Sequence, residues 1–197
     1  MLEKISALTR EQIKATLRKK RPAQIKEPGL KPAAVLMPLI SGGSGWRLLF
    51  TKRSDQVESH KGEISYPGGM IEEGESALAA ALRETYEELG IEEDRIHILG
   101  ELDEILTFTG FRIRPFVAQL SWPTPLRPNP GEIESVHILA LSGFADPSLF
   151  KTETWKRNNQ DYPVYFYEFP ECRVWGATAK ITKNLIDRLE LGNTRGE

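Results

Sequence analysis

The chain has 197 residues, of which 40% are hydrophobic and 27% are charged, proportions typical of a soluble globular protein with one buried core. Its formal net charge of −2 argues against a nucleic-acid-binding protein that works through bulk electrostatics, because such proteins carry a clear basic excess. No apolar run approaches the roughly 20 residues that span a bilayer, and the N-terminal residues lack the apolar segment of a signal peptide. We therefore expect a cytoplasmic protein that binds neither nucleic acid nor a membrane.

The N-terminal residues divide into a helix and a connector. Apolar residues recur at helical spacing over residues 2–19 and predict an amphipathic helix, which we expect to pack on the domain or to form the surface of a homodimer. Residues 21–32 hold three prolines and a glycine and predict an extended connector. We therefore assign residues 1–32 to an N-terminal helix and connector, and residues 33–191 to the main domain.

The main domain begins with strand-like segments. Apolar runs at 33–40 and 46–51, joined by a Gly- and Ser-rich loop, predict a β-hairpin. Further strand-like segments follow at about 95–108, 112–120, 133–140, 151–156 and 163–169. Residues 122–131 hold four prolines and predict a loop, and a last helix is expected at 177–191. Short strands with two or three helices predict an α/β or α+β sandwich, with a mixed sheet covered on both faces.

One helix stands out in the middle of the chain, over residues 77–89. Ser76 is placed to cap its first turn, and Gly90 is placed to end it. Leu78, Leu82, Tyr86 and Leu89 recur at helical spacing and are predicted to form the stripe that packs on the core.

The same helix carries clustered glutamates. Glu84, Glu87 and Glu88 lie three and four positions apart and are expected to converge on one face. Carboxylates this close repel one another unless a cation neutralises them. Mg²⁺ and Mn²⁺ prefer oxygen ligands, and a carbonyl from the Pro67–Gly69 turn could complete the set. For an isolated helix, a solvated acidic face would be the simpler interpretation.

The residues around the glutamates favour the metal site. They follow the pattern G-x5-E-x7-R-E-U-x-E-E-x-G-U, in which U is a bulky aliphatic residue, with Thr85 as the one departure. The matching positions are Gly69, Glu75, Arg83, Glu84, Glu87, Glu88, Gly90 and Ile91. This segment resembles the signature box of the Nudix hydrolases. Thr85 is β-branched and close to valine in volume, so we expect it to change packing rather than chemistry.

The resemblance implies an α/β/α sandwich with a mixed β-sheet and hydrolysis of a nucleoside diphosphate linked to another group. It implies Mg²⁺ or Mn²⁺ as cofactor, with Glu84, Glu87, Glu88 and the Gly68 carbonyl as ligands. Arg83 would orient a neighbouring glutamate, together with Glu75. Members of the family carry the general base either in the box or on a later loop, so the catalytic candidates are Glu84, Glu87, Arg83 and Glu132. For Glu132, an exposed loop carboxylate is an equally good interpretation.

The segment before the box indicates a substrate. Arg53, Ser54 and Gly62, followed by Tyr66-Pro67-Gly68-Gly69, resemble the extra motif of the coenzyme A diphosphatase subfamily. That resemblance implies cleavage of coenzyme A or acyl-coenzyme A to adenosine 3',5'-bisphosphate and a 4'-phosphopantetheine. Arg53, Ser54 and Lys61 become the candidate substrate-binding residues. Glu58 stands where the subfamily has an arginine, which keeps ADP-ribose and dinucleoside polyphosphates as alternative substrates. A non-catalytic nucleotide sensor is the alternative from another class.

Overall fold

The computed structural model describes residues 8–43, 45–56, 61–157 and 160–189. Its α-helices are α2 (Arg10–Arg18), α3 (Ala77–Leu89) and α4 (Gly176–Arg188), with 3-10 turns η1 (Glu93–Arg95) and η2 (Leu141–Ala145). The strands are β1 (Lys31–Gly42), β2 (Gly45–Arg53), β3 (Ile64–Ser65), β4 (Gly68–Met70), β5 (Ile96–Glu101), β6 (Ile105–Leu106), β7 (Phe111–Leu120), β8 (Ile133–Ala140), β9 (Phe150–Arg157), β10 (Gln160–Glu168) and β11 (Arg173–Trp175). Within the described residues, none of the helices has the length and apolar character needed to cross a membrane.

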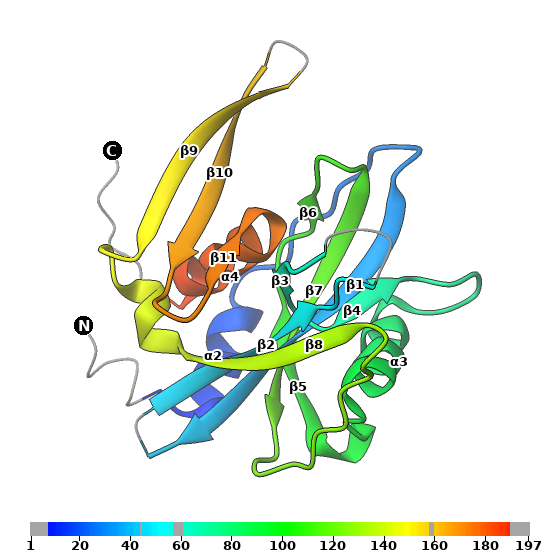
Figure 1. Ribbon diagram of the computed structural model, residues 1–197, viewed down its shortest axis with the longest axis vertical. Coiled ribbons are helices and arrows are strands. Elements are labelled where there is room, and N and C mark those ends of the chain that lie inside the picture. The colour runs from blue at the N-terminus through cyan, green and yellow to red at the C-terminus, as the bar shows by residue number, and fades with distance from the viewer. Residues whose placement is uncertain (1–7, 44, 57–60, 158–159, 190–197) are drawn as a thin grey trace.

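A mixed sheet forms the centre of the molecule. Strands β3, β2, β1, β7 and β5 lie side by side, while β4 pairs with β1, β6 with β7 and β8 with β2. The long β1–β7 pair is parallel and the other pairs in this sheet are antiparallel. Strands β9, β10 and β11 form a second, antiparallel sheet, and the β9–β10 hairpin projects from the body (Figure 1). The predicted mixed α+β fold is confirmed.

The central sheet is covered on both faces because successive side chains of a strand point to opposite sides. On β1, Ala34 and Leu36 belong to the apolar cluster under α3. Met37 and Leu39 belong to the cluster that packs with α2 and α4 on the other face. The three layers seen in Figure 1 therefore follow from the alternation of side chains along this central strand.

The boundaries of several predicted elements shift. The first helix was predicted over residues 2–19, of which residues 2–7 lie outside the described residues. It begins at Arg10 because Thr9 caps it: the Thr9 hydroxyl accepts the Gln12 N–H, and the Gln12 side chain accepts the Thr9 N–H. The strand predicted at 95–108 is two strands, β5 and β6, separated by residues 102–104.

Candidate active site

Local sequence fixes where the glutamate helix α3 starts and stops. The Ser76 Oγ accepts the Ala79 N–H at 3.1 Å and so satisfies a free donor of the first turn. Gly90 ends the helix with a left-handed φ of 65°, and its N–H donates to the Tyr86 carbonyl at 2.7 Å. The helix therefore spans the predicted residues, between the two predicted caps.

The predicted core stripe of α3 is wrong at one position. Leu89 is buried, and Leu78 and Leu82 are partly buried against the same apolar cluster. Tyr86, placed in the stripe by its spacing, is 52% exposed. The helix also buries Ala80, Ala81, Thr85 and Glu88, which the predicted stripe did not include. The Thr85 hydroxyl donates to the Ala81 carbonyl at 2.6 Å, so this departure from the box is satisfied within the helix.

Arg83 gathers the acidic side chains of the box. Its Nε donates to Glu75 at 3.0 Å and its Nη2 donates to the other Glu75 oxygen at 3.1 Å, a bidentate pair. Its Nη1 donates to Glu84 and to Glu87, each at 3.0 Å, and Nη2 also reaches the Met70 carbonyl at 3.2 Å. One guanidinium thus holds three carboxylates and the strand before the helix in fixed positions.

Glu88 differs from Glu84 and Glu87, because those two carboxylates pair with Arg83 and Glu88 does not. Its side chain is buried, with 2% of the residue exposed, and its Oε2 has no hydrogen-bond partner. The pKa of Glu88 is raised to about 8: desolvation and the charges of Glu84 and Glu132 raise it, while the charge of Arg53 and a backbone hydrogen bond from Gly68 lower it. Burying a carboxyl group without a partner is costly, and a group perturbed in this way is a candidate for a functional position.

Two glycines of β4 bring the backbone against this carboxylate cluster. A Cβ on Gly68 would lie 2.3 Å from the Ala34 carbonyl oxygen, and the φ of Gly68 is 151°, so no larger residue fits between β4 and β1. A Cβ on Gly69 would lie 2.4 Å from the carboxyl group of Glu84. The Glu84 carboxylate therefore rests on bare backbone, where desolvation raises its pKa.

The proline-rich loop carries Glu132 to the same place. The N–H groups of Arg127 and Asn129 donate to the carbonyls of Leu89 and Glu88, which docks the loop on the C-terminal end of α3. The Asn129 side chain donates to the Glu132 carboxylate at 3.0 Å. The charge of Glu132 acts on both Glu84 and Glu88. The structure therefore brings this loop glutamate to the box, 44 positions after Glu88 in the chain.

The candidate substrate-binding residues are not all equivalent. Arg53, at the end of β2, is close enough to lower the pKa of Glu88 by its charge. Ser54 is buried; its N–H donates to the Glu132 carbonyl at 2.7 Å and its hydroxyl accepts the Gln56 N–H, so it shapes the turn. Lys61 is exposed. Glu58 lies outside the described residues.

The chemistry of the carboxylates fits a hard cation better than their present arrangement does. Over the part of the chain that the structure describes, no three acidic, histidine or cysteine side chains lie close enough together to hold a metal ion, and Arg83 binds Glu84 and Glu87. The donor set nevertheless fits Mg²⁺ or Mn²⁺, because it consists of carboxylate and carbonyl oxygens. Glu88 also presents a buried oxygen that no protein group satisfies.

Known proteins share this sequence and architecture. A model of the NUDIX domain matches residues 30–165. A protein of Photorhabdus laumondii named "Uncharacterized Nudix hydrolase NudL" is 32% identical over 160 residues, which cover 81% of this chain and 85% of the relative. Its namesake in Escherichia coli K12 is 29% identical over 163 residues, or 82% and 83% of the two chains.

Solved structures have the same fold. A MutT/nudix family protein from Enterococcus faecalis matches 93% of this chain and 70% of its own, with a TM-score of 0.54 and 15% identity. An Ap4A hydrolase from C. elegans matches 56% of this chain and 80% of its own, with a TM-score of 0.50 and 20% identity. At these identities the likeness extends to the fold.

Proposed function

Because the chain belongs to the Nudix family, and is thus a Nudix hydrolase, we propose that the carboxylate cluster on α3 hydrolyses the diphosphate of coenzyme A or of an acyl-coenzyme A. The products would be adenosine 3',5'-bisphosphate and a 4'-phosphopantetheine. The observation that carries the catalytic part is the buried, unsatisfied carboxylate of Glu88, beside Glu84, Glu132 and the backbone of Gly68. A buried carboxyl group of this kind costs stability and is a candidate for a catalytic or metal-binding role.

In this proposal Glu84, Glu87, Glu88 and the Gly68 carbonyl hold Mg²⁺ or Mn²⁺. When bound, the metal supplies positive charge for the diphosphate and lowers the pKa of an attacking water. Arg83 is a positioning residue: its bonds to Glu75, Glu84 and Glu87 fix those carboxylates before substrate arrives.

Glu132 and Arg53 complete the proposed machinery at this end of α3. Glu132, held by Asn129 on the docked loop, is our candidate for the base that takes the proton of the water. Arg53 is proposed to bind the diphosphate, because its charge already lowers the pKa of Glu88 in the same cluster.

The coenzyme A assignment rests on the residues before the box. Arg53, Ser54, Gly62 and the Tyr66–Gly69 segment resemble the subfamily motif, and the contacts of two of them support the proposal. Arg53 acts on Glu88, and the Ser54 N–H holds the backbone of Glu132. One observation favours another nucleoside diphosphate derivative, such as ADP-ribose: Glu58 reverses the charge that the motif carries at that position.

One experiment tests both levels of the proposal. Purified protein is supplied with Mg²⁺ or Mn²⁺ and screened against coenzyme A, ADP-ribose, NADH and dinucleoside polyphosphates, with product analysis to identify the bond cut. We expect the highest kcat/KM for coenzyme A or an acyl derivative. A higher value for ADP-ribose would contradict the coenzyme A assignment, and no cleavage of any of them would contradict the catalytic one.

A further inference from the structure

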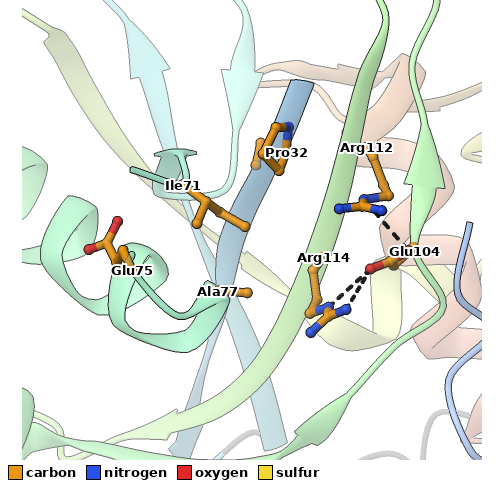
Figure 2. Close-up of a pocket in the computed structure, with 8 residues that line it drawn as sticks. Pro32, Ile71, Glu75, Ala77, Glu104, Arg112 and Arg114 are labelled. Carbon is orange, nitrogen blue, oxygen red and sulfur yellow. Dashed lines mark hydrogen bonds and ion pairs between the residues drawn. The ribbon is translucent and has the colours of Figure 1, made fainter. Parts of the chain in front are cut away.

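A second polar site lies beside the carboxylate cluster and is not used by the proposed chemistry. It is a hollow of about 240 Å³ across the N-terminal end of β1. Figure 2 shows two arginines of β7 on one side of it and apolar side chains on the other. The lining residues are Pro32, Ala33, Ile71, Glu75, Ala77, Glu104, Arg112 and Arg114. Pockets that take whole drug-sized ligands measure roughly 300–1,000 Å³, so this hollow has room for part of a ligand.

The two arginines are held in place by one buried carboxylate. Glu104, whose side chain is 3% exposed, accepts Arg114 Nη2 at 2.8 Å and Nε at 3.1 Å through Oε1. Its Oε2 accepts the Ile25 N–H at 2.7 Å and lies 3.9 Å from Arg112 Nε. The Ile25 carbonyl accepts Arg112 Nη1 at 3.2 Å. Glu104 thus holds both guanidinium groups, as the dashed lines of Figure 2 show, and Ile25 of the connector before β1 bonds to Glu104 and to Arg112.

This arrangement leaves positive charge and hydrogen-bond donors at the hollow. One carboxylate faces two guanidinium groups, and the other acid of the lining, Glu75, is bound to Arg83. Arg112 and Arg114 keep 36% and 32% of their side chains exposed. Among the residues that the structure describes, Arg112 Nη2 and Arg114 Nη1 have no hydrogen-bond partner. Guanidinium groups with free N–H donors match the oxygens of a phosphate.

The hollow also lies close to the carboxylate cluster along β1. Ala33 lines the hollow and Val35, two residues further along β1, pairs with Gly68 of the carboxylate cluster. Two residues of a strand span about 7 Å. The charge of Arg53 lowers the pKa of Glu88, and in the proposed function Arg53 binds the diphosphate. A phosphate elsewhere on the substrate therefore needs another cation.

We propose that this hollow is a subsite for a phosphomonoester on the nucleoside end of the substrate, bound by Arg112 and Arg114, with Pro32, Ile71 and Ala77 against the nucleoside. The inference rests on the proposed hydrolysis of a nucleotide diphosphate. It selects nucleotides that carry a phosphate in addition to the diphosphate that is cut.

Binding measured in chelator tests the subsite without turnover. Calorimetry compares adenosine 3'-monophosphate with adenosine, which differ by the one phosphate. A charge-assisted hydrogen bond of the usual strength predicts at least about 10-fold tighter binding of the monophosphate to the wild-type protein. Arg112→Gln should remove most of that difference and Arg112→Lys should keep part of it. Arg95→Gln, which alters an exposed arginine of η1, is the matched control and should keep all of it.

The fold should tolerate the loss of Arg112 better than that of Arg114, because the ion pair of Arg112 with Glu104 is the longer of the two. As a measurement that needs no variant, the monophosphate should shift the backbone amide NMR signals of Ala33, Ile71 and Ala77 in the wild-type protein, and adenosine should not. Equal binding of the two nucleosides, or an unchanged difference in Arg112→Gln, would overturn the subsite.

Kinetics separates this inference from the function on which it rests. With metal present, the ratio of kcat/KM for coenzyme A to that for 3'-dephospho-coenzyme A should fall at least about 10-fold in Arg112→Gln and stay unchanged in Arg95→Gln. If the phosphate strengthens binding in chelator but no nucleotide is hydrolysed, the proposed function is contradicted and the subsite is supported. If the protein hydrolyses the substrate but the additional phosphate changes neither binding nor kcat/KM, the subsite is contradicted and the proposed function is supported.

Discussion

Replacing Glu88 with glutamine should stabilise the metal-free protein, by an amount that depends on pH. Below about pH 4.5 the carboxyl is protonated in the folded and unfolded chain alike, so it contributes no difference. Between that value and its folded pKa of about 8, the folded protein keeps a proton that the unfolded chain releases, so the free energy of unfolding falls as pH rises. Each pH unit in this interval lowers the free energy of unfolding by about 1.4 kcal/mol, so the whole interval lowers it by on the order of 3–5 kcal/mol.

Glutamine has the shape of the carboxylate without its charge, so Glu88→Gln removes this cost. We expect thermal melts in chelator to show a small difference between Glu88→Gln and wild type at pH 5 and a growing advantage for the variant up to pH 8.5. Glu87→Gln is the matched control, because Glu87 is half exposed on the same helix and its loss should give no comparable growth with pH. A variant that is less stable than wild type at pH 8.5 would refute the reasoning, and would make Glu88 a structural residue.

Other substitutions give distinct expectations. Activity should require Mg²⁺ or Mn²⁺ and vanish in chelator, and Glu84→Gln should lower kcat on the order of 10²-fold through lost charge stabilisation; full turnover would exclude its assigned role. Arg83→Lys keeps one charge but cannot make the bidentate pair with Glu75, so kcat should fall while the melting temperature changes little. Asp103→Asn should cost about 1.5–3 kcal/mol in chemical denaturation, because Arg188, 6% exposed, loses its charged partner. Although desolvation raises the pKa of Asp103, hydrogen bonds and Arg188 lower it overall, so its contribution should be lost as pH falls below about 4.

The parts of the fold that could be predicted are those with local causes. The bounds of α3 follow from Ser76 and Gly90, whose capping chemistry acts within one turn of the helix. The β1–β2 hairpin follows from two apolar runs around a glycine-rich turn. The parallel pairing of β1 with β7 joins residues about 80 positions apart, such as Lys31 and Phe111, and no short pattern in the sequence carries that information.

The candidate site was predictable in composition but not in arrangement. Helical spacing placed Tyr86 in the core, yet Tyr86 is exposed and Glu88 is buried. The burial of a side chain depends on how α3 packs on the rest of the fold, which is a tertiary property. Arg112 and Arg114 were missed although a signal existed: two arginines at alternate positions of a strand share one face.

The helix α3 carries its acidic side chains in two different environments. Arg83 pairs with Glu75, Glu84 and Glu87 and fixes their geometry, while its one positive charge offsets one of their three negative charges. Glu88 lies on the buried face, and its Oε2 has no partner there. The chain therefore buries one carboxyl oxygen without a partner at a defined point. A cation bound there in the folded chain alone would raise folding stability, so our proposal predicts that metal affinity and folding stability are coupled through Glu88.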